Sequence, residues 1–252
     1  MIQTIKNYIN QDIDVLLFDE VDSTNNICKE LGKKEFKNTL VLAKSQTGGR
    51  GRLGRTFISK KEKGIYMSLL LNSDISINNI SKITCVVGTS IVKVLKEYIN
   101  DNLYIKWVND IYLNDFKICG ILTESLILNG NVKNIVIGIG LNLEHQDFPT
   151  DVVASSIYDQ TGIILDKYEL VGKITNQILN DLSDVNNLAH VDYFKNHLYM
   201  KNETVELLLQ NRKYIGKING INDDFNLLAE VNGEIKTISS GEILRIIKIK
   251  EE

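Results

Sequence analysis

The segment "QTGGRGRLGR", residues 46–55, holds four glycines and three arginines within ten positions. We call it the glycine-arginine loop. Two known templates fit its letters: G-x-G-x-x-G, the dinucleotide fingerprint, and a Walker A loop in which Arg55 replaces the lysine. Both require a helix directly after the loop, but the next residues, "TFISKKEKGIYMSLLL", have no helical period. A kinase-type loop is rejected as well, because no H-R-D or D-F-G sequence follows.

The composition of the loop still indicates a ligand. Glycines let backbone N–H groups come close to a bound molecule, and the guanidinium groups of Arg50, Arg52 and Arg55 suit phosphate or carboxylate. Such a loop can order over an anionic ligand and exclude water from it. The alternative is a solvated turn that happens to be basic, and the interleaving of arginines with glycines makes it the weaker interpretation.

Patterns on both sides of the loop predict an α+β protein. Strands are expected at 14–21, 38–46, 64–72, 103–108 and 111–144, the last with a turn at Asn114-Asp115 and a hairpin signal at 129–131. Helices are expected from Asp22 or Ser23 onward, and over 78–99, 166–182 and 189–200. From Thr204 five short segments separated by Asn, Asp, Gly and Ser predict a small β-barrel. We therefore divide the chain into domains at 1–202 and 203–252.

Overall composition narrows the classes of function. A net charge of −3 argues against a surface that binds nucleic acid through many phosphate contacts. No apolar run reaches the length of a membrane span, and the N-terminal residues do not resemble a signal peptide. Three widely spaced cysteines suit a reducing cytosol, and the three histidines show no metal-ligand spacing. We expect a cytoplasmic protein that binds no DNA or membrane and holds no metal in a cluster of its own side chains.

A second group of candidate residues lies at 106–140. Lys106, Asp110 and Lys117 surround a tight turn between apolar strands, where an ammonium is partly desolvated and attracts an anion. Taken singly, each is more often an exposed hairpin charge. Gly120 interrupts one strand, and "IGIGLNL" at 137–143 removes side chains from one strand face at alternate positions. These glycines indicate either a groove for a slender ligand or close packing beneath a helix.

Five motifs in register, with a closing segment, resemble the biotin protein ligase family. They are "DSTN" (22–25), "GGRGRLGR" (48–55), "KWVND" (106–110), "FKICGIL" (116–122) and "IGIGLN" (137–142), followed by "SGEILRI" (240–246). The resemblance implies a class II synthetase-like fold shared with lipoate ligases, with a central mixed or antiparallel sheet and a small C-terminal SH3-like barrel. It also implies a two-step reaction. Biotin and Mg-ATP give biotinyl-5′-adenylate, and the adenylate then acylates one lysine of a biotin carboxyl carrier protein or carrier domain.

The resemblance also implies roles for individual residues. The catalytic group comprises Lys117, Arg50, Arg52 and Asp110, with Mg²⁺ near Asp110. The nucleotide-binding group comprises Arg52, Arg55, Asn109, Asn142 and Arg245. The biotin-binding group comprises Ser23, Thr24, Asn25, Gln46, Arg50, Gly51, Arg52, Lys117, Gly120 and Gly138. In this interpretation the glycine-arginine loop is a lid over the adenylate.

Two departures from the family pattern and three alternatives accompany this prediction. Val108 stands where the family usually has proline, which leaves the placement of Asn109 and Asp110 less constrained. About a dozen residues precede the first expected strand, fewer than a helix-turn-helix needs, so we expect a ligase without a DNA-binding domain. Homodimers are common in the family. The alternatives are a lipoate or octanoate ligase, a nucleic-acid-binding module, and a binding protein without turnover.

Overall fold

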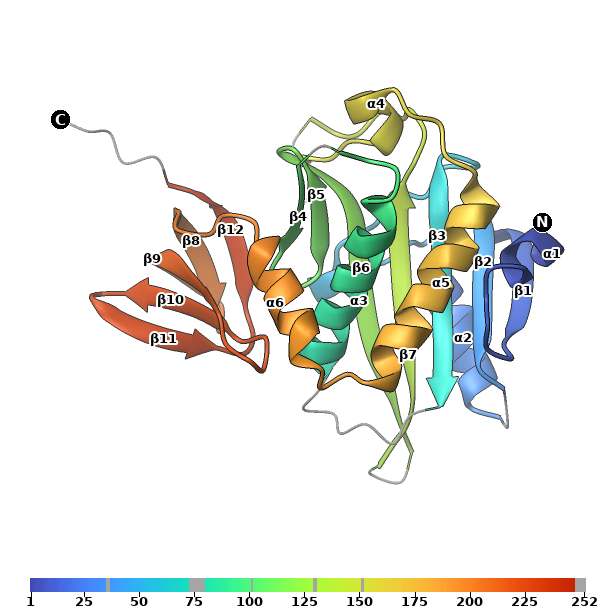
Figure 1. Cartoon of the computed structure of the whole chain (residues 1–252), viewed down its shortest axis with the longest axis horizontal. Helices are drawn as coiled ribbons and strands as arrows, with labels where there is room; N and C mark the ends of the chain where they lie inside the picture. The colour runs from blue at the N-terminus through green and yellow to red at the C-terminus, as the bar shows by residue number, and fades with distance from the viewer. Residues whose placement is uncertain (35–36, 73–79, 101, 129–130, 151, 248–252) are drawn as a thin grey trace.

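The computed structural model describes residues 1–34, 37–72, 80–100, 102–128, 131–150 and 152–247. Within these residues the chain builds two β-sheets, a larger one with helices on both faces and a smaller one formed by the C-terminal part (Figure 1). This α+β architecture confirms the predicted fold class. The expected hairpin at 129–131 falls largely outside the described residues.

The larger sheet has the strand order β1-β2-β3-β7-β6-β5-β4. β1 and β2 run parallel, and every other neighbouring pair is antiparallel. The interior strand β3 is buried on both faces up to its last residue, because helices cover the sheet from either side. The strands are β1 (Asp14–Val21), β2 (Thr39–Gln46), β3 (Gly64–Asn72), β4 (Leu103–Lys106), β5 (Asp110–Leu113), β6 (Phe116–Leu128) and β7 (Asn131–Asn142).

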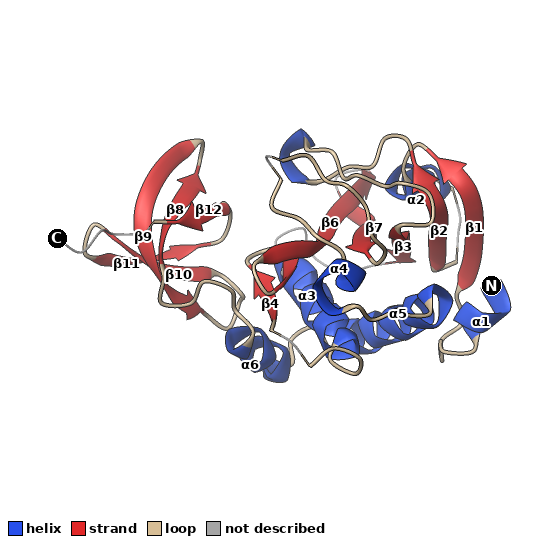
Figure 2. Ribbon diagram, turned by 90° about the horizontal axis from the view of Figure 1, so that it is seen from above, coloured by secondary structure: helices blue, strands red, loops and turns tan. Residues whose placement is uncertain are grey.

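Two long helices cover one face of this sheet, and a short one covers the other (Figure 2). α3 (Ile80–Leu95) and α5 (Lys167–Ser183) pack against each other, and α3 lies on β6. On the opposite face, α2 (Thr24–Gly32) contacts β2, β3 and β7. α1 (Ile2–Lys6) packs on α5, and α6 (Leu188–Asn196) contacts α3 and the second sheet. Among the described helices, none combines the length and apolarity that crossing a bilayer requires.

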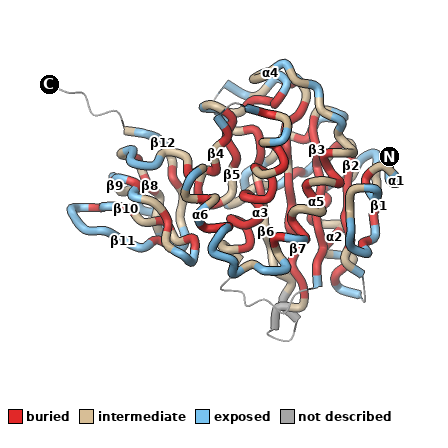
Figure 3. The backbone as a smooth tube through the Cα atoms, viewed as in Figure 1, coloured by how far each residue is buried: buried red, intermediate tan, exposed pale blue. Residues whose placement is uncertain are grey.

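The amphipathic pattern of α3 and α5 explains why they cover the sheet. The apolar positions predicted to face a core, such as Ile83 and Ile91 on α3 and Ile174 on α5, are fully buried. Each such side chain contributes about 1.5–3 kcal/mol through burial. The carboxylate of Asp166 accepts hydrogen bonds from two backbone N–H groups at the start of α5, which fixes where that helix begins. Figure 3 shows the resulting buried layer between helices and sheet.

The smaller sheet begins at Thr204, beside the predicted domain boundary. Its five antiparallel strands have the order β11-β10-β9-β8-β12, which agrees with the predicted SH3-like barrel. The indole N–H of Trp107 donates to the backbone oxygen of Phe225 at 2.8 Å and ties the two sheets together. The strands are β8 (Thr204–Leu209), β9 (Arg212–Ile221), β10 (Leu227–Val231), β11 (Glu234–Ile238) and β12 (Glu242–Ile246).

Most predicted elements are confirmed, with differences at short elements. α2 begins after Ser23, one of the two predicted capping residues. Asn114-Asp115 forms the two-residue turn between β5 and β6, and Asn114 adopts the positive φ of 53° that such a turn requires. The sequence did not predict α1 or α4 (Ile157–Thr161), both of five residues.

Candidate active site

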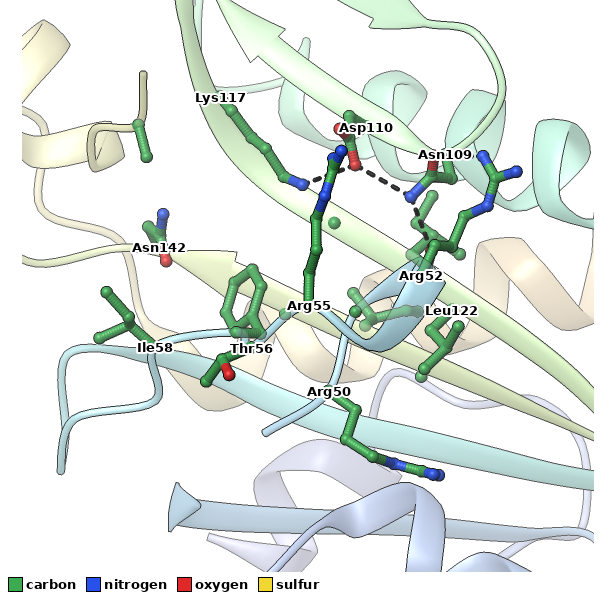
Figure 4. Close-up of a pocket in the computed structure, with 18 of the residues that line it drawn as sticks. Arg50, Arg52, Arg55, Thr56, Ile58, Asn109, Asp110, Lys117, Leu122 and Asn142 are labelled. Carbon is green, nitrogen blue, oxygen red and sulfur yellow. Dashed lines mark hydrogen bonds and ion pairs between the residues drawn. The ribbon is translucent and has the colours of Figure 1, made fainter. Parts of the chain in front are cut away.

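A cavity of about 590 Å³ lies between the larger sheet and the C-terminal sheet. This volume is typical of small-molecule sites. The glycine-arginine loop forms one wall, strands β5, β6 and β7 form the floor, and residues 242–244 of β12 close the side that faces the C-terminal sheet. Figure 4 shows side chains from the loop and from these strands gathered around the same space.

The floor depends on three glycines that admit neighbouring side chains. Gly120 on β6 pairs with Gly140 on β7. A Cβ atom at Gly140 would collide with the ring of Phe57, and one at Gly138 would collide with the side chain of Asn25. These glycines line the cavity and also allow Phe57 and Asn25 to pack closely on the sheet. The predicted close packing is confirmed, by Asn25 of α2 over Gly138 and by the Phe57 ring over Gly140, whereas a groove for a slender ligand stays a prediction.

Hydrogen bonds fix the polar end of the cavity at the start of α2. The backbone N–H of Thr24 donates to Oε1 of Gln46 at 2.8 Å. The buried hydroxyl of Ser68 on β3 contacts Thr24 Oγ1 at 2.7 Å and Asn25 Oδ1 at 2.5 Å. Nδ2 of Asn25 donates to Oε2 of Glu124 at 2.9 Å. Because each amide has a donor or acceptor on a defined side, the orientations of Gln46 and Asn25 are set before any ligand arrives.

Four polar side chains form a continuous chain across the cavity. Nζ of Lys117 lies 2.7 Å from Oδ1 of Asp110, and Nδ2 of Asn109 donates to the same oxygen at 3.0 Å. The guanidinium of Arg52 donates to Oδ1 of Asn109 at 3.0 Å and to the backbone oxygen of Gly241 at 3.3 Å. The Lys117 and Asp110 side chains are 28% and 19% exposed, so the pair is shielded but reachable.

Lys106 adds a second ammonium to the same cavity. It is partly buried, and burial lowers its pKa, although Asp110 and Glu242 act in the opposite direction. Its Nζ lies 5.4 Å from the centre of the Tyr112 ring and 3.5 Å from the backbone oxygen of Leu244. A desolvated cation of this kind interacts strongly with a negatively charged ligand, because little water competes for it.

The three arginines of the loop have different partners. Arg52 belongs to the polar chain described above, whereas the guanidinium of Arg55 binds both carboxylate oxygens of Glu242 on β12. This bidentate hydrogen bond raises the pKa of Arg55, although burial acts in the opposite direction. Arg50 Nη2 lies 3.0 Å from Oε2 of Glu124. In Figure 4, Arg50 points away from the Lys117–Asp110 pair, whereas Arg52 and Arg55 lie on the same side of the loop as this pair.

The loop itself folds into one tight turn. Residues Arg52–Gly54 form a single 3₁₀ turn in which Leu53 has a φ of 55° and is mostly exposed. The backbone N–H of Gly51 donates to the oxygen of Arg55 at 2.7 Å. The chain then continues through residues 57–60 and a turn at 61–62 into β3 rather than into a helix. This geometry agrees with the rejection of the dinucleotide and Walker A templates.

The structure brings almost all predicted site residues to this cavity. Arg245 is the exception: its Nε lies 3.2 Å from Glu206, and its side chain is 71% exposed outside the cavity. The predicted site residues that line the cavity are Ser23, Thr24, Asn25, Gln46, Arg50, Gly51, Arg52, Arg55, Asn109, Asp110, Lys117, Gly120, Gly138 and Asn142. Asn142 is buried, and its Nδ2 donates to the backbone oxygen of Ser155 at 3.0 Å.

Three residues of the site were missed in the sequence. Phe57 follows the glycine-arginine loop and packs on the glycine floor. Glu242 lies in "SGEILRI", the same segment from which Arg245 was chosen. Glu124 is a carboxylate within the apolar strand "FKICGILTESLIL", and this position is the sequence signal that could have identified it.

The fold and the site together define a class of protein, and comparison with family models names it. Residues 17–142 match the model of the Biotin/lipoate A/B protein ligase family. The matched part contains the glycine-arginine loop, the Lys117–Asp110 pair and the glycine floor. The chain belongs to this family.

Relatives and solved structures extend the similarity beyond the matched part. The chain is 30% identical to the bifunctional ligase/repressor BirA of Bacillus subtilis over 91% of its own length and 73% of that protein. It is 21% identical to the biotin–[acetyl-CoA-carboxylase] ligase of Mycobacterium tuberculosis over 84% of this chain and 80% of that one. Its structure is similar to a biotin protein ligase of Aquifex aeolicus in complex with biotin and ATP. The TM-score is 0.80 and the identity 29%, over 92% of this chain and 97% of that chain.

Proposed function

We propose that this chain is an ATP-dependent biotin protein ligase. It activates biotin with ATP to biotinyl-5′-adenylate and releases pyrophosphate, and it then transfers the biotinyl group to a lysine of a carrier protein with release of AMP. The observation that carries the proposal is the Lys117–Asp110 pair, which lies between the glycine floor and a loop with three arginines in one cavity. The similarity to biotin ligases, including the Aquifex aeolicus enzyme in complex with biotin and ATP, supports the choice of biotin.

The polar end and the floor of the cavity suit biotin. Biotin has a compact polar ring system and an apolar chain that ends in a carboxylate. We assign its ring system to the Thr24 and Gln46 end, where amide and hydroxyl groups have fixed directions. The chain then passes over Gly120 and Gly138, and its carboxylate meets Lys117.

The positive groups of the cavity suit the first step. Attack of the carboxylate on the α-phosphate builds negative charge on phosphoryl oxygens and on the leaving pyrophosphate. Four cationic side chains line the cavity and supply donors on opposite sides of it: Lys106 and Lys117 from the sheet, and Arg52 and Arg55 from the loop. Fixed cationic donors stabilise such a transition state more than water does, because they need no reorientation. The adenylate is a mixed anhydride that water hydrolyses, and we assign the glycine-arginine loop the role of a lid.

The site suits Mg²⁺ that arrives with ATP. Among the described residues, no group of three or more His, Cys, Asp or Glu side chains is placed to hold a metal. Mg²⁺ commonly binds one or two carboxylates together with substrate phosphates, and Asp110 lies at the centre of the polar chain. We propose that Asp110 would supply this carboxylate, and that Mg²⁺ held there would neutralise developing phosphate charge. Chelation by EDTA should therefore stop pyrophosphate release.

The second step requires a carrier protein. We propose a biotin carboxyl carrier protein or the equivalent domain of a carboxylase as the acceptor. A lysine ammonium must lose a proton before it attacks the adenylate. The Asp110 carboxylate, partly exposed in the cavity, orients the incoming lysine in this proposal. The cytosol is the proposed location, because all three cysteines are unpaired and buried. A homodimer remains a prediction, which sedimentation tests.

The family also includes lipoate ligases, so lipoate or octanoate is the alternative substrate. The test compares pyrophosphate release from ATP in the presence of biotin, lipoate or octanoate at equal concentrations. Release that depends on biotin alone supports the proposal. Release with lipoate or octanoate but not biotin overturns it, and binding of biotin without release identifies a binding protein without turnover.

A further inference from the structure

Glu124 holds three donors at the edge of the active site. It lies on β6, and its carboxylate binds Arg50 of the loop at 3.0 Å, Asn25 of α2 at 2.9 Å and Lys29 of α2 at 2.6 Å. Its side chain is only 24% exposed. Arg50 and Asn25 line the main cavity, while Glu124 lines a smaller adjoining cavity beneath the loop.

The two cations on Glu124 are bound by different oxygens. Lys29 contacts Oε1, whereas Arg50 and Asn25 both contact Oε2. Burial raises the pKa of Glu124, but hydrogen bonds from Lys29 and Asn25 outweigh it, so the pKa lies below its usual value. Glu124 is therefore ionised at neutral pH. Lys29 keeps the carboxylate paired if Arg50 leaves, so the departure of Arg50 does not strand a partly buried charge.

The geometry points to Glu124 as a positioning residue that holds the Arg50 guanidinium away from the Lys117–Asp110 pair until an anionic ligand competes for it. This inference rests on the proposed function, in which the loop closes over an adenylate. The Arg50 guanidinium points away from the Lys117–Asp110 pair (Figure 4) and is bound by a carboxylate instead. A ligand carboxylate or phosphate offers the same type of contact, so Arg50 exchanges one anion for another when the loop closes.

Such an exchange has a defined energetic consequence. The Arg50–Glu124 pair must break both when the glycine-arginine loop opens to solvent and when Arg50 turns to a ligand. A weaker pair therefore makes loop opening and ligand binding easier. A stronger pair makes both harder. The positive charge of Lys29 repels Arg50 and partly neutralises the carboxylate that both contact, so removal of this charge strengthens the Arg50 contact. Changes at Glu124 and Lys29 must therefore act in opposite directions.

The first experiment measures trypsin cleavage within residues 50–55 of the ligand-free protein. Glu124→Gln keeps the side-chain shape but removes the charge. Cleavage should become faster by about two- to fivefold, the factor expected for loss of one partly exposed ion pair. Lys29→Met should slow it. The control is Glu30→Gln, which removes a carboxylate from the exposed Glu30–Lys33 pair on the same helix and should leave the rate unchanged.

The second experiment measures the dissociation constant of biotin for the same variants by calorimetry. Glu124→Gln should bind biotin more tightly by the same factor, and Lys29→Met more weakly. A merely structural role of Glu124 would weaken binding in both variants. Parental cleavage rates in Glu124→Gln, or faster cleavage in both variants, would overturn the inference. If no variant binds biotin, the proposed function fails, whereas the ranking of cleavage rates still decides whether Glu124 restrains the loop.

Discussion

Replacement of Lys117 by methionine tests the centre of the active site. Lys117 lies 2.7 Å from Asp110, and the two side chains are 28% and 19% exposed. Methionine keeps the length and removes the charge. An oriented donor in a shielded site typically contributes about 3 kcal/mol to the transition state, so pyrophosphate release at saturating biotin and ATP should fall by about 100-fold. The unpaired Asp110 should also cost about 1–2 kcal/mol of folding stability, between the values for exposed and for buried pairs.

A matched control separates the two effects. Lys93 on α3 lies 3.0 Å from Asp181 on α5, with side chains 28% and 10% exposed, and neither residue lines the cavity. Lys93→Met should lose similar stability in urea unfolding but retain the parental rate. The reasoning is wrong if Lys117→Met keeps more than a tenth of the parental rate, or if Lys93→Met loses as much activity.

Four further predictions follow from other contacts. Gly140→Ala places a methyl group against the Phe57 ring, so it should cost about 1–3 kcal/mol of folding stability and weaken biotin binding. Unchanged stability and unchanged affinity would contradict the close contact between Phe57 and Gly140. Arg52→Gly should release pyrophosphate more slowly, because one donor is lost, but release should not stop, and the variant should biotinylate serum albumin added as a bystander. Modified albumin lysines are counted by mass spectrometry, and a count no higher than with the parent would show that Arg52 is not a lid residue. Lys106→Met removes a charge whose burial is unfavourable, so the free energy of unfolding should rise by about 1 kcal/mol. Pyrophosphate release should become slower in the same variant, and a loss of stability would contradict the prediction. The pKa of Glu124 in the folded protein lies below its usual value of 4.5, so the ionised carboxylate should stabilise the fold fully above pH 4.5 and lose this effect as the pH falls further. The free energies of unfolding of the parent and Glu124→Gln should therefore converge at low pH, and a difference that persists there refutes this.

Long elements with a clear pattern could be predicted from the sequence. The apolar run of β3, the amphipathic faces of α3 and α5, and the Asn114-Asp115 turn each carry a local signal. α1 and α4 have five residues each, which is too short for a helical period to become visible. These helices depend on packing against distant parts of the chain, such as the contact of α1 with α5.

The sequence predicts which residues line the active site better than it predicts which residues they pair with. The motifs place glycines, lysines and arginines at strand ends and in one loop, and the fold brings these segments to one cavity. The pairing of Arg50 with Glu124 spans 74 positions, and that of Arg55 with Glu242 spans 187, so sequence spacing carries no information about either. Arg245 pairs across strands with Glu206 on β8, which explains why it lies outside the cavity although its neighbour Glu242 lines it.

Transfer of biotin to a carrier protein tests the central claim most directly. The purified chain is incubated with biotin, Mg-ATP and a biotin carboxyl carrier domain, and the intact mass of the carrier is measured. We expect the mass to increase by one biotinyl group, only when ATP is present and only when the acceptor lysine is intact. An unchanged carrier mass, with the chain folded and pyrophosphate absent, would contradict the assignment of this cavity to biotin activation and transfer.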